Sequence, residues 1–87
     1  MEPEINEMIG FYRHFKGNFY HVEGVAKHSE TLEPMVVYRA LYGEGALWVR
    51  PLEMFFEKVE KPEYQGPRFV RVDRSELPSS ALTFLDE

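Results

Sequence analysis

Cysteine is absent from the 87 residues of this sequence. Disulfide bonds, thiolate zinc sites and cysteine nucleophiles are therefore excluded. The sequence also lacks any apolar run close to the roughly 20 residues that cross a membrane, and its first residues are acidic, unlike those of a secretory signal peptide. We expect a cytoplasmic protein with no membrane partner.

A chain of this length forms one domain at most and buries only about 60 to 65% of its unfolded surface, so its core must be small. Hydrophobic residues make up 44% of the chain and charged residues 29%, which is typical of a globular rather than a disordered protein. Seven Phe, five Tyr and one Trp are more aromatic rings than such a core can enclose. We therefore expect some Tyr or Trp rings at the surface, because each has a polar tip.

The net charge of −5 is unevenly distributed along the chain. Residues 1–9 contribute −3 and residues 73–87 contribute another −3, whereas residues 10–72 hold nine Lys or Arg and eight Asp or Glu, a net of +1. Overall charge therefore neither excludes nor favours a polyanionic partner. Dedicated nucleic-acid domains usually carry a larger basic excess.

Composition and turn signals divide the chain into a lead-in at 1–9, a single small β domain at 10–72, and a C-terminal tail at 73–87. We expect the tail to be disordered or to form a short helical turn. Pro51 ends one strand because proline cannot donate to a ladder. Within the β domain, runs rich in aromatic and β-branched residues predict six strands. These strands are residues 10–15, 19–26, 35–42, 47–50, 56–60 and 69–72.

The strands predict a mainly β fold, either a small antiparallel barrel or a curled sheet of five to six short strands, with a Src-homology-3-like order. One short 3₁₀ turn is expected near residues 52–55, which are too few for a stable helix. Closing the sheet would hide edge strands that otherwise invite aggregation. The main alternative is an open curled sheet with one helix packed on it.

Several motifs stand together in this region. They are YRHFKG at residues 12–17, HSET at 28–31, VYRALYG at 37–43, WVRP at 48–51 with Met54-Phe55 after it, and GPRF at 66–69. In this combination the sequence resembles the bacterial family described as domain of unknown function 1653, over roughly residues 10–72. The resemblance implies a small, largely β protein. It implies no established activity, so no catalytic role is carried over.

The most polar segment between two predicted strands is His28-Ser29-Glu30-Thr31. Loops on a rigid scaffold commonly carry binding residues. One interpretation makes His28 and Glu30 an acid–base or hydrogen-bonding pair, with Ser29 and Thr31 in contact with a ligand. The other is that Ser29 and Thr31 satisfy backbone groups of their own loop.

Three arginines lie within strand-like runs rather than in loops: Arg13, Arg39 and Arg50. Strand arginines on a small sheet either pair with carboxylates of their own chain or form a cationic patch for a phosphate or carboxylate ligand. Aromatic neighbours would add the stacking surfaces that single-stranded nucleic-acid binders use. The candidates are Tyr12, Tyr38 and Trp48.

Exposed aromatic rings also line the grooves in which Src-homology-type barrels hold extended peptides. Pro51 and Met54, just after the fourth strand, are candidates for the floor of such a groove. The candidate lining rings are Tyr12, Tyr42, Trp48 and Tyr64.

We therefore predict a binding module that recognises a small ligand, a peptide or a nucleic-acid segment and needs no cofactor. The candidate face comprises Arg13, His14, His28, Ser29, Glu30, Thr31, Tyr38, Arg39, Trp48 and Arg50. An enzyme is the less favoured interpretation, because the sequence has no Gly-rich phosphate loop and no nucleophile elbow. If it is one, His14, His28 and Glu30 would form its acid–base or metal site. A third hypothesis is a structural subunit that forms a homodimer.

Overall fold

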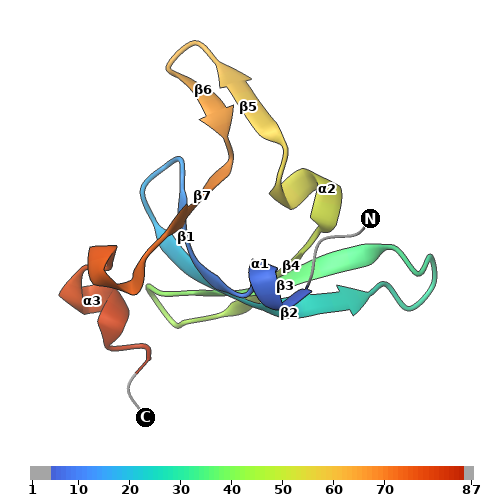
Figure 1. The fold of residues 1–87 in the computed structure, drawn as a ribbon, viewed down its shortest axis with the longest axis horizontal. Coiled ribbons are helices and arrows are strands. Elements are labelled where there is room, and N and C mark those ends of the chain that lie inside the picture. Colours follow the sequence, from blue (N-terminus) through green and yellow to red (C-terminus); the bar gives the residue numbers. More distant parts are fainter. Residues whose placement is uncertain (1–4, 86–87) are drawn as a thin grey trace.

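The computed structural model describes residues 5–85, which form a mainly β domain with a twisted five-stranded antiparallel sheet (Figure 1). The sheet has the order β4-β3-β2-β1-β7. Its strands are β1 (Gly10–His14), β2 (Phe19–Lys27), β3 (Pro34–Ala40), β4 (Leu47–Pro51) and β7 (Phe69–Val72). A separate hairpin pairs β5 (Lys58–Lys61) with β6 (Tyr64–Pro67). The helical turns are α1 (Ile5–Met8), α2 (Leu52–Phe55), the 3₁₀ turn Arg74–Glu76 and α3 (Ser79–Leu82). None of the helices in residues 5–85 is both long and apolar enough to cross a membrane.

The prediction of a mainly β fold with a curled sheet is confirmed, and the sheet is open. Within residues 5–85 the sheet does not close into a barrel, because β4 and β7 remain its two edges. Residues 5–85 form seven strands rather than the predicted five or six. The additional strand is β6, whose Gln, Gly and Pro residues are weak strand formers. Residues 52–55 form a turn of α-helix rather than the expected 3₁₀ turn, with the Phe56 amide donating to the Leu52 carbonyl at 3.3 Å.

One side of the sheet carries the larger core, and we call it the inner face. It is built by alternate residues of neighbouring strands, which include Tyr12, Val22, Tyr38 and Phe69. Phe55 covers them from α2, and its ring stacks on that of Phe69 at 4.0 Å with only 5° between the planes. The residues that alternate with these point to the opposite side, which we call the outer face.

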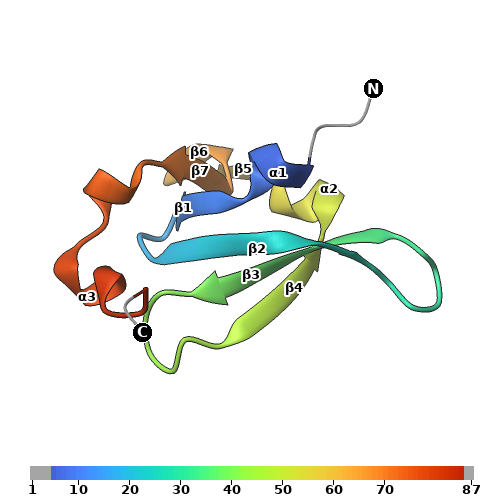
Figure 2. The ribbon, with the colours of Figure 1, turned by 60° about the horizontal axis from the view of Figure 1, so that its bottom comes forward.

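The C-terminal segment covers one end of the outer face (Figure 2). Leu77 and Ala81 are buried there against Leu41, and partly buried rings of Phe11 and Phe19 pack beneath them. Asp73 opens the segment with a capping box: its carboxylate accepts from the Ser75 amide while Glu76 reaches back to the Asp73 amide. The rest of the outer face, on β3 and β4, lacks this cover.

Candidate functional site

Strand register places three of the predicted binding residues together on the inner face. Tyr38 of β3 lies directly opposite Trp48 of β4, and Arg50 follows two residues later on the same face. The Arg50 Nε donates a hydrogen bond to the Tyr38 hydroxyl at 3.3 Å. This bond holds the guanidinium at its Nε and, within residues 5–85, leaves the terminal nitrogens available to bind another group.

His14 joins this group from the end of β1, where it lies opposite Phe69 in β7. Its ring contacts those of Phe69 and Phe15, with centroid separations of 4.9 and 4.6 Å. The Nδ1 atom accepts a hydrogen bond from the Lys16 amide at 3.1 Å. The neutral ring therefore carries its proton on Nε2, which is left as a donor.

The surroundings of His14 are partly desolvated and positively charged. Burial is the larger of the influences that lower the pKa of this imidazole below 6.5, and nearby cations lower it further. In decreasing order of effect, these cations are Arg68, Arg50, Lys16 and Lys61. The neutral imidazole is thus favoured in the free protein, and a bound anion would reverse that preference.

Two of these cations lie near the Phe15 ring. The Lys61 and Lys16 ammonium nitrogens lie 5.3 and 5.9 Å from its centroid, distances that suit cation–π contacts. The β5–β6 hairpin that carries Lys61 contacts the turn after β1 through Tyr64, whose ring stacks on Phe15 at 5.1 Å. The hairpin therefore adds positive charge to a face otherwise built by the sheet.

The two arginines beside His14 retain unused donors. Across residues 5–85, no carboxylate lies within 4.0 Å of Arg50. Arg68 has one carboxylate neighbour, Glu57, at a long 3.8 Å, and its buried Nε has no hydrogen-bond partner in the described part of the chain. A buried donor without a partner costs about 1 to 3 kcal/mol, so an added acceptor here would be stabilising.

A pair of tyrosines extends this face toward the turn between β3 and β4. The hydroxyls of Tyr20 and Tyr42 are hydrogen-bonded at 2.8 Å. Burial, followed by this bond, raises the pKa of Tyr20, so it stays neutral. Next to the pair lies an open hollow of about 420 Å³. Its lining residues are Ala40, Tyr42, Gly43, Glu44, Ala46 and Trp48.

The Trp48 ring is 50% exposed where it borders this hollow. Because half of its surface already contacts water, we expect Trp48→Ala to lower the free energy of unfolding by about 1 kcal/mol or less. Urea unfolding followed by circular dichroism would measure this change. A loss of about 3 kcal/mol or more would instead place the ring in the core.

The other predicted residues lie elsewhere on the molecule. Arg13 and Arg39 point to the outer face, where Arg39 lies 3.9 Å from the Glu23 carboxylate. The HSET segment forms the loop between β2 and β3, at the end of β2 remote from His14 (Figure 2). In that loop, His28 Nδ1 accepts from the backbone amides of residues 30 and 31.

His14 therefore does not converge with His28 and Glu30, as the metal or acid–base hypothesis requires. Within residues 5–85, no group of three or more His, Asp or Glu side chains is placed to hold a metal ion. The ten candidate residues are thus divided among the inner face, the outer face and the loop. Only His14, Tyr38, Trp48 and Arg50 belong to the inner-face group.

Sequence reasoning missed four members of this group: Lys16, Tyr20, Lys61 and Arg68. The Tyr20 ring packs against the core, and its hydroxyl is hydrogen-bonded to that of Tyr42. Lys61 lies in the β5–β6 hairpin and Arg68 directly follows it, so both reach His14 through tertiary packing that no local sequence pattern predicts. Tyr42 was predicted to be exposed and is, whereas Tyr12, predicted to be exposed with it, is buried.

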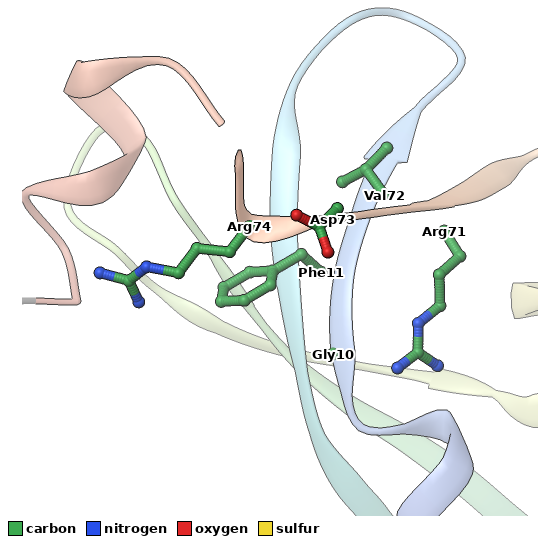
Figure 3. Close-up of a pocket in the computed structure, with 6 residues that line it drawn as sticks. All are labelled: Gly10, Phe11, Arg71, Val72, Asp73 and Arg74. Atoms are coloured by element: carbon green, nitrogen blue, oxygen red, sulfur yellow. The ribbon is translucent and has the colours of Figure 1, made fainter. Parts of the chain in front are cut away.

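A second hollow, of about 470 Å³, lies beside β1 and β7 (Figure 3). Its arginines point in different directions and do not converge on one ligand (Figure 3). Arg71 is already used by the fold, because its guanidinium donates to the backbone carbonyls of Glu7 and Ile9. Asp73 is likewise occupied in capping the 3₁₀ turn. The inner face is therefore the better candidate site.

Comparison with known proteins gives this chain a family. The family model described as "Protein of unknown function (DUF1653)" matches residues 10–71. The chain belongs to the DUF1653 family. Its similarity to that family, predicted from the motifs, is thereby confirmed. All the cations around His14 fall within the residues that define this DUF1653 domain.

A crystal structure of a DUF1653 protein from Bordetella bronchiseptica resembles the present one with a TM-score of 0.68. The two chains are 37% identical, and the match covers 75% of this chain and 86% of the other. No curated protein matches this DUF1653 chain.

Proposed function

We propose that this DUF1653 protein is a binding module for an anionic ligand, held on the inner face by His14, Arg50 and Arg68. The observation that carries the proposal is a pair of arginines with unused donors, both close enough to the His14 imidazole to lower its pKa. Guanidinium groups match the oxygens of phosphate and carboxylate, often with two parallel hydrogen bonds.

Partial burial strengthens the expected interaction. The guanidinium of Arg50 is fixed by Tyr38 before any ligand arrives, so little side-chain entropy is lost on binding. Charge–charge attraction is also less screened beside the buried rings of Tyr38 and Phe69 than in open water. A preorganised positive face therefore supports anion binding, although the net charge of the chain is negative.

An amide-resolved NMR titration with sodium tripolyphosphate tests the proposal on the full chain. We expect chemical-shift changes to cluster at His14, Arg50 and Arg68. The loop at 28–31 and Arg39 serve as internal controls and should not move. Shifts confined to those controls, or no shifts at all, would refute the proposed site.

Binding should depend on pH through His14. Because burial and the neighbouring cations hold its pKa below 6.5, the free imidazole is neutral at pH 7, and a bound anion raises that pKa. Affinity is therefore expected to rise as the pH falls from neutral toward the lowered pKa of the free imidazole, with uptake of a proton. Sulfate is a suitable probe, because its charge is constant over this range.

The matched variants for this test are His14→Gln and His28→Gln. The first should flatten the pH dependence of sulfate binding between pH 7.5 and 5. The second should leave the dependence intact, because His28 lies in the remote loop. An unchanged profile in His14→Gln would assign the pH effect to another group.

Self-association is a second candidate function, favoured by the uncovered edge strand β4. Leu47 and Val49 project from its outer face and are 57% and 60% exposed. Exposed apolar edge strands are ready templates for pairing with another chain. Sedimentation equilibrium should then show a dimer that the double variant Leu47→Lys, Val49→Lys converts to a monomer. A monomer at all accessible concentrations of the unmodified chain would rule it out.

A further inference from the structure

We infer that the anionic ligand is a single-stranded nucleic acid, with a base in the hollow between Tyr42 and Trp48 and phosphates beside Arg50 and Arg68. This inference rests on the proposed anion-binding function and adds the class of ligand. It depends on the position of the aromatic hollow, which continues the cationic part of the inner face.

The two exposed rings of the hollow offer stacking surface. Trp48 is 50% exposed and Tyr42 is 40% exposed, and the rest of the lining is small: Ala40, Gly43 and Ala46 leave the space open. The hydrogen bond between the Tyr42 and Tyr20 hydroxyls, in which either may donate, restrains the Tyr42 ring. Single-stranded nucleic-acid binders combine such rings with a positive groove, because every base has a flat π-face.

The spacing along β4 suits one nucleotide. Trp48 and Arg50 lie on the same face, two residues apart, which corresponds to about 7 Å along the strand. A base stacked on Trp48 would therefore direct its phosphate toward the guanidinium of Arg50. Farther along the same face, Arg68 and Lys61 lie near His14 and could neutralise the following phosphates.

Glu44 would orient a nucleotide bound at this site. Glu44 lines the hollow, where its carboxylate would repel phosphate but could accept hydrogen bonds from exocyclic amino groups such as that of cytosine. Phosphate is thus directed to the arginine end and the base to the turn. An extended neutral peptide would use the rings but leave the arginines unpaired, so the charges favour nucleic acid.

Trp48 is the one tryptophan of the sequence, so its fluorescence reports stacking directly. The first experiment titrates the full chain with a ten-nucleotide oligodeoxycytidine, an abasic phosphodiester of the same length and a proline-rich peptide. We expect the oligodeoxycytidine to quench the fluorescence and to bind more tightly than the abasic strand. The peptide should cause no quenching.

The second experiment compares variants by fluorescence anisotropy of a dye-labelled oligodeoxycytidine. Trp48→Ala should weaken binding by about 5- to 150-fold, the range expected for a stacked base, with little effect on binding of the abasic strand. Leu32→Ala is the control, because this side chain is 65% exposed in the loop between β2 and β3, at the end of the sheet remote from the site. It should leave both affinities unchanged.

The outcomes separate this inference from the proposed function beneath it. Equal affinity for the abasic strand and the oligodeoxycytidine would overturn the base site while leaving anion binding intact. Failure of both strands and of tripolyphosphate would overturn the proposed function itself. Binding of the proline-rich peptide with quenching, and of neither strand, would overturn the nucleic-acid assignment in favour of a peptide groove.

Discussion

Replacing Arg50 by glutamine is expected to weaken tripolyphosphate binding by about 10- to 150-fold, the range expected on losing hydrogen bonds to a charged partner. The guanidinium is fixed by the Tyr38 hydroxyl and has no carboxylate within 4.0 Å in residues 5–85. Its donors are therefore available to the ligand at little entropic cost. Isothermal titration calorimetry on both proteins would measure the change.

The matched control is Arg39→Gln. Arg39 lies on the neighbouring strand, carries the same charge and points to the outer face, beside Glu23. Both variants remove one positive charge from the protein, so a general electrostatic effect would weaken binding equally in the two. We expect Arg39→Gln to change affinity by less than about twofold, since exposed ion pairs contribute little. Equal losses would contradict a specific role for Arg50.

The largest loss of stability is expected from Phe55→Ala, which should lower the free energy of unfolding by about 3 to 5 kcal/mol. The Phe55 side chain is fully buried. It stacks on Phe69 and meets the edges of Tyr12 and Tyr38 at 5.4 and 5.3 Å. Removing it would leave a cavity under the sheet and detach α2 from the inner face. Denaturant unfolding monitored by circular dichroism would measure the loss.

Phe56→Ala is the control, because the adjacent ring is 44% exposed and should cost much less. Phe55→Leu keeps most of the buried volume, so it should remain folded even if the alanine variant does not. Comparable losses for Phe55→Ala and Phe56→Ala would mean that the core is not organised around the stacked Phe55–Phe69 pair.

Much of the sheet could be predicted from local patterns. β3 and β4 are rich in β-branched and aromatic residues. The glycines at 43 and 45, in the turn between these strands, have φ values of +58° and +67°, which glycine adopts readily. Local patterns could not predict that the sheet stays open rather than closing into a barrel, because this depends on whether the edge strands β4 and β7 pair with each other. The β5–β6 hairpin was half missed, since its second strand contains Gly66 and Pro67.

The candidate site illustrates the same limit. Period-two alternation predicts that Trp48 and Arg50 share a face. It does not say whether Arg39 on the next strand lies with them, because one residue of register reverses every side chain. The observed pairing of Tyr38 with Trp48 puts Arg39 on the other face. Lys61 and Arg68, in and just after the β5–β6 hairpin, reach the site only through tertiary packing, which alternation along a strand does not predict.

The β5–β6 hairpin also has a consequence for motion. A two-stranded sheet is marginally stable by itself, and this hairpin projects from the larger sheet (Figure 1). It is attached through the Phe15–Tyr64 stack and through the backbone hydrogen bonds of Arg68 with Phe15 and Glu57. Its amides should therefore exchange with solvent through local opening, well before those of β2 and β3. A ligand that touches Lys61 or Arg68 would oppose that opening, so occupancy would be recorded as slower hydrogen exchange in the hairpin.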